Sequence, residues 1–168
     1  MIKLIGAIFL ITAGAMTGIY RSFALTQRVS LLEEYITLIN EIETQIRYSA
    51  QPLYQMLESM ADKNSMGGFL HNLLSHAQGE DDFSQAWERA VDAIENNTGI
   101  TKQDKVIIKE FGAGLGKTDI DGQIAHCNLC MASARNNLKK AREEKDTKSK
   151  LYRSLGLLGG TACALLIL

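Results

Sequence analysis

Uncharged apolar runs at both ends of the chain are the feature that most constrains its fold. The first run, "LIGAIFLITAGAMTGIY", lies between Lys3 and Arg21, and the second, "SLGLLGGTACALLIL", follows Arg153. As α-helices they would be roughly 25 Å and 22 Å long, a little shorter than a hydrocarbon core of about 30 Å. The two runs predict short membrane helices at residues 2–20 and 154–168, which hold both ends of a central domain, 21–153, at one membrane face.

Two other interpretations of these runs stay open. The first run could be a cleaved signal peptide with Ala13, Gly14 and Ala15 near its processing site, but a soluble secreted protein has no need of the second run. An uncleaved anchor combined with a buried C-terminal helix is the other alternative. Glycines four residues apart, at 14 and 18 and again at 156 and 160, would let two membrane helices approach closely.

Basic residues flank the inner ends of both runs. Arg21 and Arg28 follow the first run, and seven basic residues precede the second: Lys139, Lys140, Arg142, Lys145, Lys148, Lys150 and Arg153. The positive-inside rule therefore predicts a cytoplasmic central domain. We interpret the basic run as a solvated helix face that fixes topology, with contact to anionic lipid head groups as the alternative. A net charge of -1 provides no general attraction for nucleic acid.

The central region shows helical periodicity throughout. It contains the only proline, Pro52, near which one helix should end and another begin. Apolar residues at steps of three and four are typical of amphipathic helices, and two such sets stand out: Leu25, Val29, Leu32, Ile36, Ile39 and Ile46, then Ile120, Ile124, Cys127, Met131, Ala134, Leu138 and Ala141. Since no alternating strand pattern is present, we predict an all-α, antiparallel helical bundle.

Local signals indicate where the shorter helices end. Gly79 should end one helix, the stretch 96–99 should form a turn, and Thr101 with Asp104 resembles a capping pair for the helix that follows. Trp87 lies on the apolar face of its segment and should belong to the core.

The stretch "FGAGLGKTDIDGQ", residues 111–123, resembles a nucleotide-binding loop at first sight. A Walker A loop would need glycine at position 111, where this chain has Phe111, and it should follow a buried strand rather than a helical pattern. We therefore interpret the stretch as a connector between two helices. Its glycines allow left-handed backbone, and Thr118 can cap the next helix, with Asp119 contributing to the same cap. Asp119 and Asp121 lie near that helix's positive end.

Candidate sites for metal or redox chemistry are weak. Cys127 and Cys130 form a C-x-x-C pair beside His126, but a zinc site normally needs a second ligand pair and a redox motif normally follows a strand. His71 and His76 have no acidic or nucleophilic partner in the sequence. We predict no catalytic residue, no cofactor and no metal site, so the protein is not expected to be an enzyme.

The layout of the chain and the motif Leu115-Gly116-Lys117-Thr118-Asp119, followed by Gln123, resemble the stage III sporulation protein AB family. The resemblance extends from end to end, although Thr118 stands where serine is expected more often. It implies a helical domain similar to the type II secretion platform protein F. Because an exposed loop can be a contact surface, the connector is the candidate partner-contact site, formed by Leu115, Gly116, Thr118, Asp119 and Gln123.

The resemblance further implies a component of the complex that links mother cell and forespore, located in the mother-cell membrane around the forespore. Its expected partners are other proteins of this channel complex, including a cytoplasmic motor ATPase, and a homo-oligomer is compatible with that role. A membrane-anchored helical domain without a catalytic constellation suits a non-enzymatic platform or adaptor. A membrane-anchored helical signalling or receptor module is the alternative.

Overall fold

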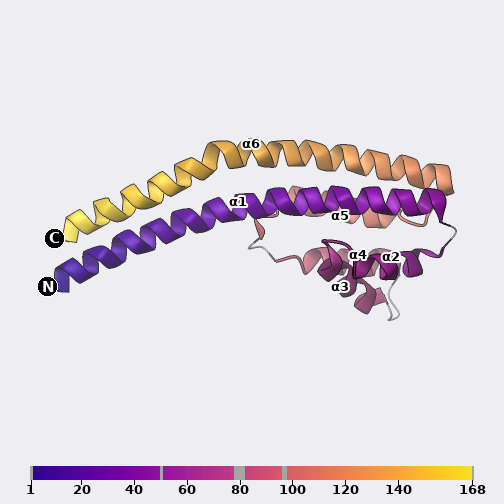
Figure 1. Cartoon of the computed structure of the whole chain (residues 1–168), viewed down its shortest axis with the longest axis horizontal. Helices are drawn as coiled ribbons and strands as arrows, with labels where there is room; N and C mark the ends of the chain where they lie inside the picture. Colours follow the sequence, from indigo (N-terminus) through magenta and orange to yellow (C-terminus); the bar gives the residue numbers. More distant parts are fainter. Residues whose placement is uncertain (1, 50, 78–81, 96–97, 168) are drawn as a thin grey trace. The chain divides into compact units, whose positions relative to one another are not determined.

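The computed structural model describes residues 2–49, 51–77, 82–95 and 98–167, with side chains between residues 6 and 165 of those ranges. Within them the chain forms helices and no strand, which confirms the all-α class (Figure 1). The six helices are α1 (Ile2–Tyr48), α2 (Leu53–Ala61), α3 (Gly67–Ala77), α4 (Phe83–Asp92), α5 (Lys102–Gly114) and α6 (Ile120–Ile167).

The chain divides into two compact units. Unit 1 consists of residues 1–29 and 139–168, and unit 2 of residues 30–138. The long helices α1 and α6 each contribute one part to unit 1 and the other part to unit 2. The boundaries between the units, at 29/30 and 138/139, separate compact parts of the chain. The boundaries predicted at 20/21 and 153/154 separate membrane helices from the central domain, and they stay predictions.

In unit 1 the two helices pack antiparallel through the glycines that the sequence singled out. A Cβ atom built at Gly14 would lie 2.6 Å from the carbonyl oxygen of Gly156 and 2.9 Å from the Cα atom of Gly160. One built at Gly18 would collide with the backbone of Tyr152. Because any larger residue would meet backbone atoms, the close approach of these helices depends on glycine.

The outer faces of this helix pair are apolar. On α1 the exposed large side chains include Ile8, Phe9, Met16 and Ile19, and on α6 they include Leu155, Leu157, Leu158 and Leu165. Among the described residues, α1 is the one helix that is long and apolar enough to cross a membrane by length and composition, counted from Gly6. Only 11% of its apolar window is buried, unlike the core helix of a soluble protein. The uncharged run at the end of the sequence, residues 154–168, contains fifteen residues, fewer than an 18-residue membrane-spanning window.

Unit 2 has a continuous core with a series of aromatic rings at its centre. Trp87 of α4 is fully buried, as predicted, and its ring contacts Phe69 of α3 and Phe111 of α5 with centroid distances of 5.1 and 5.6 Å. Phe111 in turn contacts Tyr35 of α1 at 6.1 Å. The indole Nε1 donates a hydrogen bond to the carbonyl oxygen of Ile108 at 2.8 Å, so this large ring is buried without an unsatisfied polar atom.

The predicted apolar seams agree with many of the buried residues of α1 and α6. In α1, Val29, Leu32 and Ile39 are buried. Ile42 is buried as well and fills the gap that the pattern leaves between Ile39 and Ile46, where the expected step falls on Glu43. Two fully buried α1 residues, Tyr35 and Leu38, were not assigned to that seam. In α6 the residues from Cys127 to Ala141 in the predicted seam are buried, but Ile120 is 60% exposed, so its assignment to the seam was wrong.

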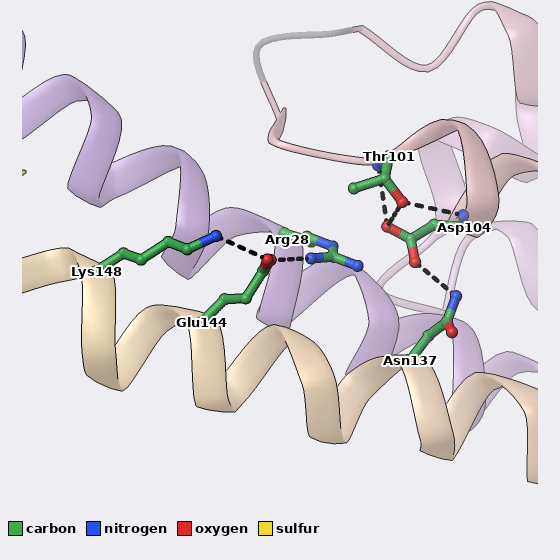
Figure 2. A network of polar contacts seen from close by, with 6 residues as sticks. All are labelled: Arg28, Thr101, Asp104, Asn137, Glu144 and Lys148. Atoms are coloured by element: carbon green, nitrogen blue, oxygen red, sulfur yellow. Dashed lines mark hydrogen bonds and ion pairs between the residues drawn. The ribbon is translucent and has the colours of Figure 1, made fainter.

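The start of α5 is fixed by a capping box, as predicted. The backbone amide of Asp104 donates to the Thr101 hydroxyl at 3.2 Å, and the amide of Thr101 donates to the Asp104 carboxylate at 2.9 Å. Figure 2 shows that Asn137 of α6 also donates to this carboxylate, at 2.8 Å. The fully buried Asp104 therefore joins α5 to α6, and hydrogen bonds offset the cost of burying its charge.

Other predicted boundaries fall near observed ones. Pro52 immediately precedes α2, where its fixed φ and missing amide hydrogen are tolerated. Gly99 has a φ of 70°, which agrees with a turn before α5. The helix end predicted at Gly79, and positions 96 and 97 of the predicted turn, lie outside the described residues.

Candidate partner-contact site at the connector between α5 and α6

The connector lies where the sequence predicted it, between the end of α5 and the start of α6. Leu115 is buried with 4% of its surface exposed, whereas the positions from Gly116 to Asp119 are exposed. The buried leucine anchors one end of the connector in the core of unit 2. The other four positions reach solvent between two helices of the same unit.

Gln123, in the first turn of α6, holds the connector in shape. Its side-chain oxygen accepts a hydrogen bond from the Gly116 amide at 3.1 Å. Its side-chain nitrogen donates to the carbonyl oxygen of Gly114 at 3.2 Å and to the hydroxyl of Thr118 at 3.1 Å. One amide group, 5% exposed, therefore bonds to the end of α5 and to two positions of the connector.

Gly116 is the position at which the chain reverses direction. Its φ is +75°, in the left-handed region that glycine adopts without a steric penalty. A Cβ atom built there would lie 3.7 Å from Leu53, an ordinary contact distance. Glycine is therefore required by backbone conformation and not by lack of space.

The cap of α6 is Asp119 and not Thr118, so the predicted assignment of the cap to Thr118 was wrong. The Asp119 carboxylate accepts a hydrogen bond from the amide of Gly122 at 2.9 Å, and its carbonyl accepts the first helical hydrogen bond, from Gln123. The helix begins at Ile120, so Asp119 holds the N-cap position. Thr118 lies one residue too early for this role, and its hydroxyl accepts from Gln123 instead.

His126 closes the carboxyl end of α5, a role the sequence did not reveal. Its Nε2 donates to the carbonyl oxygen of Phe111 at 3.0 Å. Its ring also stacks on the Phe111 ring, with a centroid distance of 5.7 Å and an interplanar angle of 6°. A Cβ atom at Gly114 would collide with this imidazole. The carbonyl of Gly112 accepts from the amide of Leu115, and the carbonyl of Gly114 accepts from the side chain of Gln123. With the bond from His126 to Phe111, three of the last four carbonyls of α5 therefore have hydrogen-bond partners.

Three backbone amides of the connector and of the first turn of α6 donate to acceptors within the protein. The amides of Leu115, Gly116 and Gly122 donate to Gly112, Gln123 and Asp119 respectively. A phosphate-binding loop instead needs successive amides that point outward at one anion. The arrangement therefore suits a rigid helix connector better than a nucleotide cradle.

The five residues of the candidate site separate into two groups. Leu115 and Gln123 are buried and can act on a partner only through the shape of the connector. Gly116, Thr118 and Asp119 are exposed and could contact a partner directly. The exposed group continues into Ile120, a large apolar side chain that the sequence pattern had assigned to the core, and into the acidic Asp121.

A small cavity adjoins the connector. Its volume is about 270 Å³, and its lining comes from the starts of α2 and α4 and from the end of α5: Leu53, Asp82, Phe83, Ser84, Gly112, Leu115, Gly116 and Lys117. The exposed face of the connector is therefore next to a recess that could accept one side chain of a partner.

The C-x-x-C pair lies on α6, and both of its side chains are buried in the core of unit 2. Burial raises the pKa of Cys127 and the pKa of Cys130 from 9.0 to about 11, so both thiols are protonated at neutral pH. Their sulfurs are therefore poor nucleophiles and poor metal ligands. No group of three or more His, Cys, Asp or Glu residues in the described part of the chain is arranged to hold a metal ion.

Comparisons with known proteins agree on one family. The family model described as stage III sporulation protein AB matches residues 3–168. The stage III sporulation protein AB of Bacillus subtilis (strain 168) is 25% identical over 171 residues, and the match covers 100% of both chains. A solved structure of a stage III sporulation protein AB has a TM-score of 0.64 at 18% identity, covering 72% of this chain and 98% of that one, and it supports the fold alone.

Proposed function

Because this chain belongs to the stage III sporulation protein AB family, a family of sporulation proteins, we propose that it is a non-enzymatic membrane platform. In this proposal the protein is part of the channel complex that links mother cell and forespore. It resides in the mother-cell membrane around the forespore, keeps unit 2 in the cytoplasm and docks a motor ATPase there. The likeness of unit 2 to the type II secretion platform protein F, implied by the family resemblance, is part of the same proposal.

The glycine-paired helices of unit 1 are the observation that carries the proposal. Gly14 and Gly156 meet backbone to backbone, while the outer faces of both helices expose large apolar side chains. This is the reverse of a soluble helix pair, which buries its large side chains and exposes polar ones. Small residues inside and large apolar residues outside are typical of helices that associate in lipid.

Pairing with α1 would help the apolar C-terminal part of α6 to span a bilayer. Its uncharged run has only fifteen residues and would span a bilayer poorly by itself. Paired with α1, it can share the local thinning of the bilayer that a short span requires. We therefore place both ends of the chain in the membrane as one hairpin of two helices.

The absence of enzymatic activity is proposed from the chemistry of the polar groups. The amides of Leu115 and Gly116 have acceptors within the protein, and both buried thiols have a raised pKa. His126 donates to a backbone carbonyl and stacks on Phe111, which gives it a packing role. The roles of these groups are therefore structural, which supports a scaffold protein whose connector is bound by other proteins.

Affinity purification of the tagged full-length protein from sporulating cells tests this function. We expect a cytoplasmic motor ATPase and membrane ring proteins to co-purify with it. A membrane-anchored signalling module would co-purify with neither of them. Recovery of the intact protein without these partners would therefore favour the signalling alternative.

A further inference from the structure

Charge is strongly segregated between the two units. Unit 1 contains ten basic and three acidic residues, and unit 2 contains eight basic and sixteen acidic residues. Their net charges, +7 and -8, nearly cancel, so the total of -1 conceals the separation. The unit with the apolar outer face is thus also the one that would attract anions.

Part of this positive charge is neutralised within unit 1. Figure 2 shows that Glu144 accepts from Arg28 at 2.6 Å and from Lys148 at 3.0 Å. The hydrogen bond and charge of Lys148, followed by those of Arg28, lower the pKa of Glu144. The three acidic residues of the unit all precede Lys148 in the sequence: Glu143, Glu144 and Asp146.

The basic residues next to the uncharged runs are not neutralised in this way. Arg21 of α1 and Lys150 and Arg153 of α6 are exposed. None of them forms an ion pair with a carboxylate of the described residues. Arg21 and Arg153 directly border the uncharged residues 4–20 and 154–168, and Lys150 lies three residues before Arg153.

Arg153 is held in place at this point by the helix pair. Its Nε donates to the hydroxyl of Ser22 at 3.1 Å, and Ser22, which is fully buried, also forms a short hydrogen bond with Ser149. The two Nη groups of Arg153 form no hydrogen bond with the described residues. A guanidinium that is bonded at Nε and has two open donor groups is suited to a phosphate.

Aromatic rings accompany these cations. Tyr20 and Phe23 of α1 are 58% and 55% exposed, and they flank Arg21 in the sequence. Aromatic side chains are typical of the boundary between lipid tails and head groups. We define the collar as Tyr20, Arg21, Phe23, Lys150 and Arg153.

We infer that the collar binds the phosphates of anionic phospholipids in the leaflet that faces unit 2. This inference rests on the proposed membrane insertion and adds a lipid preference to it. A solvated basic flank that only sets topology would need no contact between the helices, whereas Arg153 of α6 donates to Ser22 of α1 next to the apolar runs. The acidic unit 2 would be repelled by an anionic lipid surface, so a preference for anionic lipids has to come from the basic side chains of unit 1.

The test uses the full-length protein in nanodiscs that contain equal amounts of phosphatidylglycerol and phosphatidylcholine. The lipids retained after transfer to detergent are counted by native mass spectrometry. The collar variant combines Arg21→Gln, Lys150→Gln and Arg153→Gln. A matched control combines Lys63→Gln, Lys102→Gln and Lys117→Gln, which removes three exposed charges from unit 2 instead.

We expect the wild type and the control to be enriched in phosphatidylglycerol and the collar variant to approach the bulk ratio. Each cation close to an anionic surface contributes roughly fivefold to affinity, so the enrichment should fall by at least that factor. Equal loss in the control, or full enrichment in the collar variant, would overturn the inference. Displacement of the lipid by soluble glycerol phosphate would indicate a site for free phosphate and would overturn it too.

A parallel alkaline carbonate extraction of vesicles separates this inference from the proposed function. If the wild type is extracted, the protein is not inserted, and the proposed membrane platform fails together with the collar. If the wild type resists extraction but shows no lipid preference, only the collar fails.

Discussion

The side-chain oxygen of Gln123 accepts a hydrogen bond from the backbone amide of Gly116 at 3.1 Å, across the turn between α5 and α6. The two residues depend on one another. The amide of Gly116 points toward Gln123 because the φ of Gly116 is +75°. The side chain of Gln123 reaches this amide because Asp119 caps α6 and so fixes where the helix begins. The connector is therefore defined by one unusual backbone conformation and one buried amide.

Replacement of Gln123 by leucine should destabilise unit 2 by about 1–3 kcal/mol. The change removes three hydrogen bonds, to the carbonyl of Gly114, the amide of Gly116 and the hydroxyl of Thr118, and each such bond contributes about 0.5–1.5 kcal/mol. Urea unfolding in nanodiscs, followed by the fluorescence of Trp87, the single tryptophan, measures the effect. Asn128→Leu is the matched control, because exposed Asn128 donates only to a carbonyl of its own helix. Equal stability of Gln123→Leu and the wild type would show that the three hydrogen bonds contribute nothing.

Gly116→Val should lower the free energy of unfolding by about 1–2 kcal/mol, because a β-branched residue is strained at positive φ. Gly116→Asn should cost less, since asparagine tolerates left-handed backbone and the space beside Leu53 is open. The same fluorescence measurement compares the two. If both variants lose equal stability, side-chain crowding and not backbone conformation decides the requirement for glycine.

Gly156→Leu should separate the two helices of unit 1. A Cβ atom at this position would lie 2.5 Å from the carbonyl oxygen of Gly14 and 3.0 Å from the Cα atom of Gly18, so the helices must move apart. Oxidative cross-linking of a Ser22→Cys, Ser149→Cys pair reports on their contact, because these two hydroxyls are hydrogen bonded in the wild type. We expect a several-fold loss of cross-linking.

Gly159→Leu is the control for this change, since a Cβ atom at Gly159 meets nothing within 4 Å. It adds the same side chain to the same helix and should leave the cross-linking yield unaltered. A similar loss in both variants would mean that the effect comes from the added bulk in general and not from the glycine interface.

Helical periodicity accounted for most of unit 2, and its errors have specific causes. The step pattern of α1 continued through Ile36 and passed over Tyr35 and Leu38, which are fully buried because α1 is covered on more than one stripe by the rest of unit 2. A one-stripe pattern cannot anticipate how many neighbours a helix will have. Ile120 shows the opposite error, because the pattern assigned it to the core although it is exposed. It has the correct spacing from Ile124, but it is the first residue of α6 and lies beyond the buried part of the helix.

The connector could be located from the sequence but not constructed from it. Glycine content indicated a turn, and the positive φ of Gly116 agrees with that expectation. The choice between Thr118 and Asp119 as cap depended on a helix start uncertain by one residue, which local sequence does not resolve. The roles of His126 and Asn137 depend on tertiary contacts with Phe111 and Asp104, far from them in the sequence.

The stability of unit 2 should fall as the pH rises from about 9 to about 11. Burial holds the pKa of Cys127 and of Cys130 at about 11, whereas the same thiols ionise near 9.0 when exposed by unfolding. Below pH 9 both states keep their protons and stability is complete. Above it the unfolded state loses protons first and becomes more favourable, until the folded thiols ionise as well.

The free energy of unfolding from urea titrations at several pH values tests this dependence. Burial raises the pKa of Tyr35 as well, so its contribution has the same sign and begins above pH 10. A Cys127→Ala, Cys130→Ala variant should have a smaller slope between pH 9 and 10, where Tyr35 does not yet contribute. An unaltered slope in this variant would show that the thiols are not the groups responsible.

Asp119→Lys addresses the connector as a partner-contact site, and it follows from the proposed function. The change removes the N-cap carboxylate, at a cost of about 0.5–2 kcal/mol, and reverses the charge that a partner would meet at this exposed position. We expect the variant to keep its helical content and its membrane insertion but to co-purify with less of the motor ATPase. Circular dichroism and affinity purification from membranes measure the two effects.

Asp119→Asn separates the cap from the charge. Asparagine accepts the same hydrogen bond from Gly122, so this variant should be close to the wild type in stability while it lacks the negative charge. Reduced co-purification with Asn at position 119 would therefore identify the charge itself as part of the interface. If Asp119→Lys unfolds and Asp119→Asn behaves as the wild type, the residue serves the helix cap. If both variants fold and all partners co-purify at wild-type levels, the interface lies elsewhere on unit 2.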